Sequence, residues 1–292
     1  MTLVLFAMLA AHAPLPLEAV YERARRYDKD AFKFTPPSPE RLLAVESLAA
    51  ALLAAAPAPE PPAPLCKQAA AAGLQPLAAR DAAGALWVLR EPEGKPAGGG
   101  LFAFRPGGAP LCVQAPHSFF DTGTGALALE LFARMGAACF AVNTVHRYTP
   151  AAAGGGAPAD VAHAPATLFQ AVSKAALHGP HLAIVQLHGF GKRDDVPAEA
   201  AAVVSDGSAH PAPGSATDRL RTALARTLAA RVLLFGVDAD VLGATTNAQA
   251  REAWRAGARF LHIEMREEVR RKLAASGTAP LAEALREALE LR

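Results

Sequence analysis

The stretch of sequence that decides the fold is residues 111–145, LCVQAPHSFFDTGTGALALELFARMGAACFAVNTV. Its two ends, Leu111–Ala115 and Ala138–Val145, are short apolar runs of the kind that form buried strands. Between them, Gly125–Met135 places leucine and methionine side chains on one face of a helix. A strand, a helix and a second strand in this order predict part of a sheet that helices cover.

The same alternation of strands and helices continues to the end of the chain. The expected helices are Thr167–Leu177, Asp218–Ala230, Asn247–Ala256, Glu267–Ala275 and Leu281–Leu291, and the expected strands are His181–Leu187, Ala201–Ser205, Val232–Val237 and Arg259–Glu264. Upstream, Ala85–Arg90 and Leu101–Arg105 predict a hairpin, because a glycine- and proline-rich turn separates two apolar segments. The pattern predicts an α/β fold with three layers, α/β/α, in which a mixed central sheet lies between helices.

The N-terminal part of the chain predicts a separate region. Residues 14–64 are expected to form a small helical extension that ends in the proline-rich linker Pro57–Pro64, and residues 65–292 the α/β/α domain. Residues 1–13 contain the short apolar run Leu3–Ala11 and end on Ala11-His12-Ala13, the small-x-small form of a signal-peptidase site. We therefore expect a periplasmic or secreted protein. An ordinary first strand or helix in a cytoplasmic protein is the alternative.

The composition is that of a large globular chain with almost balanced charge. Of 292 residues, 52% are hydrophobic, and 29 Lys and Arg residues against 27 Asp and Glu residues give a net charge of +2. A chain this apolar can bury a full core, and its near-neutral charge argues against a nucleic-acid binder. No segment has enough consecutive apolar residues to span a bilayer, so we expect no stable membrane insertion.

The three cysteines do not form a recognisable metal or redox motif. Cys66, Cys112 and Cys139 lie too far apart in the sequence for a zinc knuckle or a CxxC pair. We expect buried thiols that pack as small hydrophobic side chains. One disulfide among them is the alternative if the chain is exported.

Polar side chains gather at the carboxyl ends of the expected strands, where open α/β sheets carry their functional groups. His117 and Asp121 follow one of these strands, His188 follows another, and Glu264 ends a third. Zinc in hydrolases takes three histidine or carboxylate ligands and leaves a fourth position for water. The first three residues are suitable ligands, and Glu264 is suited to take a proton from the water. The chain has no HExxH motif, which excludes a thermolysin-like site.

Several motifs occur in an order that resembles the zinc-carboxypeptidase-like superfamily. They are PHSFFDTGT, NTVHRY, QLHGF, VVSDG and TTNAQAR…FLHIEMREEVR, and they cover about Leu111 to Arg271. Within that superfamily the chain is most similar to phage-type poly-γ-glutamate hydrolases and N-formylglutamate amidohydrolases. The resemblance implies a phosphorylase/hydrolase-like core and a zinc-dependent hydrolase. The bond cleaved would be an amide in an N-acyl amino acid, a γ-glutamyl compound or a peptide-like substrate.

The resemblance also implies roles for individual residues. It implies that His117, Asp121 and His188 are the Zn²⁺ ligands and that Glu264 is the general base. The implied substrate-binding residues are Asn247, Arg266, His146 and Arg147. Asn247 and Arg266 would hold a substrate carboxylate. His146 or Arg147 would line the pocket or stabilise an oxyanion.

Asp121 departs from the family pattern. The family carboxylate is typically a glutamate in His-x-x-Glu spacing, whereas Asp121 is one methylene shorter and lies four positions after His117. This departure motivates an alternative function, a catalytically silent ligand-binding protein on the same fold. A third hypothesis is an exported structural or interaction protein whose working surface is formed by the N-terminal helices.

Overall fold

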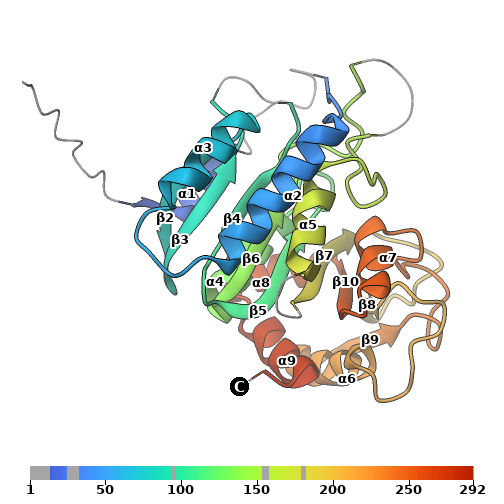
Figure 1. Cartoon of the computed structure of the whole chain (residues 1–292). Helices are drawn as coiled ribbons and strands as arrows, with labels where there is room; N and C mark the ends of the chain where they lie inside the picture. The colour runs from blue at the N-terminus through green and yellow to red at the C-terminus, as the bar shows by residue number, and fades with distance from the viewer. Residues whose placement is uncertain (1–13, 25–32, 94–96, 153–157, 179–181, 292) are drawn as a thin grey trace, which may run out of the picture.

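The computed structural model describes residues 14–24, 33–93, 97–152, 158–178 and 182–291, which form one sheet covered by helices (Figure 1). The expected signal sequence, residues 1–13, lies outside the described residues. The ten described strands are ordered β1-β2-β3-β4-β6-β5-β7-β10-β8-β9 across the sheet.

The alternation of strands and helices that the sequence predicted is present from residue 109 onward. The strands are β1 (Leu15–Pro16), β2 (Gln75–Asp81), β3 (Gly84–Arg90), β4 (Leu101–Phe104), β5 (Ala109–Ala115), β6 (Ala137–Val142), β7 (Ala183–Phe190), β8 (Ala200–Ser205), β9 (Arg231–Leu234) and β10 (Phe260–Arg266). The helices are α1 (Leu17–Ala24), α2 (Pro39–Ala54), α3 (Ala63–Ala71), α4 (Thr124–Met135), α5 (Leu168–His178), α6 (Ala216–Leu228), α7 (Ala248–Arg255), α8 (Glu267–Ser276) and α9 (Ala279–Leu289).

Parallel strands occupy the centre of the sheet. The neighbours β6, β5, β7 and β10 all run parallel, and helices α4 and α5 connect β5 to β6 and β6 to β7. On one side β4 runs antiparallel to β6 and continues into β3 and β2, and on the other side β8 runs antiparallel to β10. The sheet is therefore mixed, and the carboxyl ends of its parallel strands meet at one edge.

Side chains along each strand alternate between two cores, one on each face of the sheet. On β10, Leu261, Ile263 and Met265 pack with α1, α4, α6, α8 and α9. Phe260 packs on the opposite face with α2, α3, α5 and α7. The two cores confirm the three-layer α/β/α fold with a mixed central sheet.

Helix α2 takes part in one of these cores. Its side chains Val45, Leu48 and Leu52 are at most 1% exposed and pack in the core that also holds Phe102 of β4 and Phe169 of α5. The expected domain boundary after residue 64 stays a prediction. The packing shows that α2 covers the same face of the sheet as α5 and α7.

Two elements near the N-terminus do not follow the apolar pattern of the sequence. Helix α3 begins at Ala63, inside the expected linker Pro57–Pro64, because Pro64 occupies the first helical turn, where no N–H partner is required. Strand β2 lacks a run of large apolar side chains, but it pairs along its whole length with β3. Its place in the sheet follows from this pairing rather than from hydrophobic periodicity.

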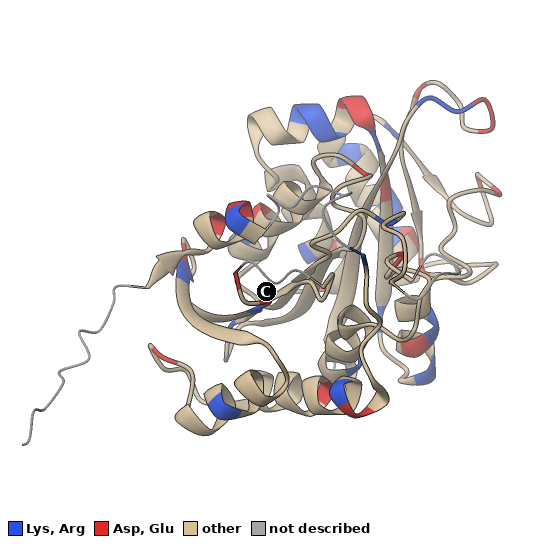
Figure 2. Cartoon of the chain, turned by 90° about the horizontal axis from the view of Figure 1, so that it is seen from above, with Lys and Arg blue, Asp and Glu red and all other residues tan. Residues whose placement is uncertain are grey.

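Charged side chains of both signs occur on the same helices and loops (Figure 2). Between α6 and α9, for example, Arg226 pairs with Glu287 at 2.6 Å. Among the described residues, no helix is both long enough and apolar enough to cross a membrane. The three cysteines are free thiols, and Cys112 and Cys139 are buried register partners on β5 and β6.

Candidate metal centre

The polar residues at the carboxyl ends of the parallel strands line a cavity of about 430 Å³. The side chains that carry its chemistry are His117, Asp121, Arg147, His163, His188, Arg193, His262 and Glu264. They come from β7, from β10 and from the loops that follow β5, β6 and β7. Segments far apart in the sequence therefore supply one site, as expected for an open α/β sheet.

The three side chains that the sequence predicted as metal ligands converge in this cavity. One nitrogen of each histidine and one oxygen of Asp121 lie within 4.8 Å of one another. Asp121 Oδ2 is 3.6 Å from His117 Nδ1 and 3.3 Å from His188 Nδ1. All three residues are buried.

The spacing of four residues between His117 and Asp121 has a structural reason. The backbone N–H of Asp121 donates to the carbonyl of His117 at 2.7 Å, and the N–H of Phe120 donates to the same carbonyl. The segment therefore makes one helix-like turn, which places side chains four positions apart on the same side. A shorter carboxylate at this spacing thus reaches the two histidines.

The ring of His117 is held from both sides. Its Nε2 lies 2.8 Å from Asp160 Oδ1, and its Nδ1 lies 3.3 Å from Nη1 of Arg147. Arg147 also donates to Asp160 Oδ2, and His163 Nδ1 lies 3.0 Å from Asp160 Oδ1. Because a carboxylate only accepts and a guanidinium only donates, His117 carries its hydrogen on Nε2 and a lone pair on Nδ1.

Strand β7 needs a glycine directly after His188. A Cβ on Gly189 would lie 2.1 Å from Nη1 of Arg270. That guanidinium is itself fixed, because it donates to the carbonyls of Thr122, Phe190 and Met265. The buried Arg270 therefore joins the carboxyl ends of β7 and β10 to the loop after β5.

The charge states of Asp121 and His188 suit a cation. Burial raises the pKa of Asp121, but the adjacent imidazoles of His117 and His188 outweigh it and hold the pKa well below its usual range. Burial lowers the pKa of His188 to about 4. Burial also lowers the pKa of His117, but the neighbouring carboxylates of Asp121 and Asp160 outweigh that effect and raise it. Asp121 is thus an anion and His188 a neutral imidazole at neutral pH, as metal ligands must be.

The donor set fits zinc. Two imidazole nitrogens and one carboxylate oxygen are the ligands of many catalytic zinc sites. The other ring nitrogen of His117, Nε2, is hydrogen-bonded to the carboxylate of Asp160, and a carboxylate is a usual partner of a metal-ligating histidine. A metal bound here would take the place of the Arg147 contact at His117 Nδ1.

Glu264 and His262 extend the site along β10. Burial, and next the charge of Asp121, raise the pKa of Glu264 to about 8. Among the described residues, Glu264 Oε2 has no hydrogen-bond partner, and Oε1 lies 3.7 Å from His262 Nε2. His262 Nδ1 lies 3.1 Å from Ser205 Oγ, and burial holds the pKa of His262 well below its usual range. The carboxyl group of Glu264 therefore has an oxygen available for a group in the cavity.

The residues expected to bind substrate fall into two groups. Arg147 lines the cavity, and its guanidinium lies over the rings of Phe120 and Tyr148. His146 is outside the lining and packs against Phe120, which does line the cavity, with the two ring centroids 5.7 Å apart. Asn247 also lines the cavity but is buried, and the backbone N–H groups of α7 occupy its side-chain oxygen.

Arg266 lies outside the lining of the cavity. Its guanidinium donates to the carbonyls of Ala200 and Pro197 and lies over the ring of Phe190. Arg193, which the sequence did not single out, lines the cavity instead and pairs with Asp195 at 2.5 Å. Among the residues that the structure describes, two arginines of the cavity lining, Arg147 and Arg193, can therefore meet an anionic group.

Part of the cavity wall is strained. In the loop after β9, Leu242 and Ala244 have φ values of 64° and 53°. Outside helix ends such values are costly for residues with a side chain, and strain of this kind concentrates at functional sites. Gly243 between them lies against the ring of Phe235, where a Cβ would be 2.3 Å away.

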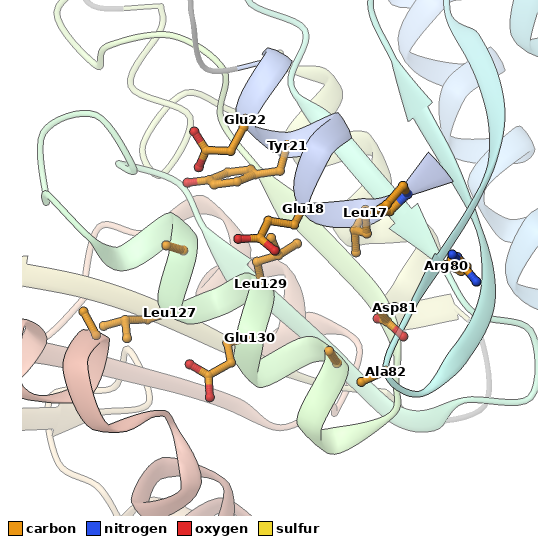
Figure 3. A pocket seen from close by; sticks show the side chains of 14 residues that line it. Leu17, Glu18, Tyr21, Glu22, Arg80, Asp81, Ala82, Leu127, Leu129 and Glu130 are labelled. Carbon is orange, nitrogen blue, oxygen red and sulfur yellow. The ribbon is translucent and has the colours of Figure 1, made fainter. Parts of the chain in front are cut away.

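A second cavity of about 430 Å³ lies between α1, α4 and the end of β2 (Figure 3). Its lining contains no histidine or cysteine among the described residues. Two of its carboxylates are paired, Asp81 with Arg105 at 2.5 Å and Glu130 with Arg134 at 2.9 Å. This cavity thus lacks the donor set of the first one.

Sequence reasoning missed Asp160, Gln186 and His262. Asp160 lies between β6 and α5 in a segment with no periodic pattern, so nothing in the sequence pointed toward it. Gln186 and His262 carry a clearer signal, because each is a polar side chain inside an apolar strand. A buried polar side chain needs a hydrogen-bond partner, which the cavity region provides.

Fold and site together define a class, a three-layer α/β/α protein with a histidine and carboxylate centre at the carboxyl ends of its parallel strands. No protein-family profile and no curated protein matches the chain. Among solved structures, gene product Atu2144 from Agrobacterium tumefaciens is 13% identical with a TM-score of 0.43, covering 62% of this chain and 88% of that chain.

Two further solved structures are similar to a comparable degree. The zinc-free apo form of YndL is 16% identical with a TM-score of 0.42, covering 65% of this chain and 89% of that chain. A metallo-carboxypeptidase from Burkholderia cenocepacia is 16% identical with a TM-score of 0.37, covering 87% of this chain and 68% of that chain. Likeness at this level carries no argument about function, which rests on the site itself.

Proposed function

We propose that the protein is a zinc-dependent hydrolase of an amide bond. One observation carries the proposal: the Nδ1 atoms of His117 and His188 lie 3.6 Å and 3.3 Å from the carboxylate of Asp121, in a cavity that Glu264 also lines. Three ligands with a carboxylate beside them are the arrangement of a hydrolytic zinc site. The order of motifs in the sequence supports the same class.

Different residues of the cavity contribute to different steps of hydrolysis. A zinc ion bound at this site supplies Lewis acidity, which polarises the amide carbonyl and makes water more acidic. Glu264, in its ionised form, takes a proton from the attacking water, whose oxygen bonds to the carbonyl carbon. When the carbon–nitrogen bond breaks, Glu264 returns that proton to the leaving nitrogen, so that a carboxylic acid and an amine result. Arg147 can donate to the oxygen on which negative charge develops.

The substrate we propose is an N-acyl amino acid, a γ-glutamyl compound or a peptide-like amide. These compounds share a carboxylate near the amide, and Arg147 and Arg193 line the cavity. A guanidinium binds a carboxylate with two parallel hydrogen bonds. The arginines of the cavity are therefore better placed for this contact than Arg266.

Metal analysis and turnover together test the proposal. Purified wild-type protein should hold one zinc ion per chain and cleave members of a panel of N-acyl amino acids, γ-glutamyl peptides and dipeptides. His188→Ala should lose both zinc and turnover, whereas Glu264→Gln should keep zinc and lose turnover by roughly 10²-fold or more. Wild-type protein without stoichiometric zinc, or a His188→Ala variant that holds as much zinc, would overturn the proposal. Zinc without any turnover would favour the catalytically silent binding protein.

A further inference from the structure

A layer of buried amide side chains lies beneath the metal centre. Its members are each at most 3% exposed and come from β5, α5, β7 and α7: Gln114, Gln170, Gln186, Asn247 and Gln249. Gln186 is the centre of this layer and is also in contact with His188. Because buried amides must satisfy every donor and acceptor, their orientation can be worked out from fixed neighbours.

The orientation of Asn247 is set by the backbone of α7. Asn247 is the N-cap of this helix, and its Oδ1 accepts the N–H of Gln249 at 2.9 Å and of Ala250 at 3.0 Å. A backbone N–H can only donate, so the atom that faces the helix is the side-chain oxygen. The amide nitrogen of Asn247 must therefore point away from the helix.

That nitrogen in turn sets the orientation of Gln186. Asn247 Nδ2 donates to Gln186 Oε1 at 2.8 Å. The two hydrogens on Gln186 Nε2 are used by Gln114 Oε1 at 2.8 Å and Gln249 Oε1 at 2.9 Å. A flipped Gln186 would place a donor against a donor at Asn247, so its oxygen stays on the side of His188.

The ring of His188 completes the chain of contacts. His188 Nε2 lies 3.1 Å from Gln186 Oε1, which can only accept, so this nitrogen carries the hydrogen. His188 Nδ1 then presents a lone pair toward Asp121, 3.3 Å away. We propose that the N-cap of α7 acts through Gln186 to hold His188 in the Nε2–H tautomer that a metal ligand needs. Asn247 and Gln186 are thus positioning residues.

Asp121 favours the opposite tautomer of His188. Its carboxylate favours a hydrogen on His188 Nδ1, and that tautomer would block the atom that faces the other ligands. The amide chain prevents this before a metal arrives. The inference rests on the proposed function only in treating His188 as a ligand, because the tautomer itself is a property of the metal-free protein.

The tautomer can be read directly by nitrogen-15 NMR on histidine-labelled, metal-free protein at mildly alkaline pH. Wild-type protein should show His188 with its hydrogen on Nε2. In Gln186→Met, which removes the acceptor, the hydrogen should move to Nδ1. The control is Gln114→Met, in which an equally buried glutamine of the same layer, without contact to His188, is replaced. This control should keep the Nε2–H tautomer.

A second variant tests the effect of Asn247 on the tautomer of His188 without removing the N-cap of α7. In Asn247→Asp the carboxylate still caps α7, since aspartate and asparagine are equally good N-caps, but the donor toward Gln186 becomes an acceptor. We expect the Nε2–H signal to be lost while α7 stays capped. Zinc affinity, measured by competition with a chelating dye, should fall about 10- to 100-fold in this variant and in Gln186→Met, and stay nearly unchanged in Gln114→Met.

The outcomes distinguish this inference from the proposed function. A wild-type His188 with its hydrogen on Nδ1, or variants that leave the tautomer as it is, would overturn the inference even if the enzyme holds zinc. Equal changes in Gln186→Met and Gln114→Met would also overturn it, because they would show a general loss of packing. If the tautomer shifts as expected in the variants but wild-type protein binds no zinc, the proposed function is wrong. The inference that Asn247 and Gln186 set the tautomer of His188 is then still supported.

Discussion

At the scale of a single residue, Glu264 couples the stability of the fold to pH. In the folded protein the carboxyl group of Glu264 keeps its proton up to about pH 8, whereas in the unfolded chain it releases the proton near its ordinary pKa of 4.5. The raised pKa means that the folded state loses stability as pH rises between these two values, at about 1.4 kcal/mol per pH unit. Glu264→Gln removes this loss, so its stabilising effect on metal-free protein should be small at about pH 5 and reach a few kcal/mol above pH 8.

Urea unfolding at several pH values, in the presence of a chelator, measures this effect. Glu268→Gln on α8 is the matched control, because it replaces an exposed carboxylate of the same strand–helix segment. A stabilisation by Glu264→Gln that is the same at low and high pH would contradict the prediction. So would an equal, pH-dependent gain in the control.

The sequence indicated which residues meet at the metal centre better than it indicated what each one touches. His117, Asp121 and His188 follow strands that proved to be neighbours, so their convergence could be expected from topology. The pairing of His117 with Asp160 depends on the path of a loop, and no local pattern encodes that path. Asn247 illustrates the same limit, because an asparagine before a helix is first of all a cap, and its contact with Gln186 required the packed structure.

At the scale of the elements, the junction of β7, β10 and α8 depends on a glycine. Gly189→Ala would place a methyl group 2.1 Å from Nη1 of Arg270, whose contacts with three carbonyls leave it no room to move. We expect a destabilisation of roughly 1–3 kcal/mol, as for other overpacked sites, together with weaker zinc binding. Gly191→Ala, two positions on, meets nothing within 4 Å and should change neither quantity. Denaturant unfolding and zinc competition measure both, and equal behaviour of the two variants would refute the role of Arg270.

The bounds of the elements were predictable where hydrophobic periodicity is strong. The helix expected at Gly125–Met135 begins one residue earlier, at Thr124, and the strand expected at Leu111–Ala115 begins at Ala109. By contrast, β2 and α3 were not expected, because one is held by pairing with β3 and the other starts inside a proline-rich segment. Local propensity is a weak guide where tertiary contacts decide.

At the scale of the whole molecule, the packing of α2 bears on whether residues 14–64 are an appendage or part of the domain. Leu48 is 1% exposed and lies in the core shared with the sheet and α5, whereas Leu43 on the same helix is 65% exposed. Leu48→Ala should therefore lower the free energy of unfolding of the whole protein by about 2–5 kcal/mol. Leu43→Ala should change it by no more than about 0.5 kcal/mol.

Unfolding followed by circular dichroism and by tryptophan fluorescence tests this prediction, because Trp87 of β3 lies in the same core as Leu48. If α2 belongs to the domain, Leu48→Ala shifts both transitions together to lower denaturant, and one cooperative transition remains. If residues 14–64 form a separate extension, the fluorescence transition stays where it is in wild-type protein and only part of the helical signal is lost early. The second result would place the boundary where the sequence predicted it, and the first would make α2 a covering layer of the sheet that carries the metal centre.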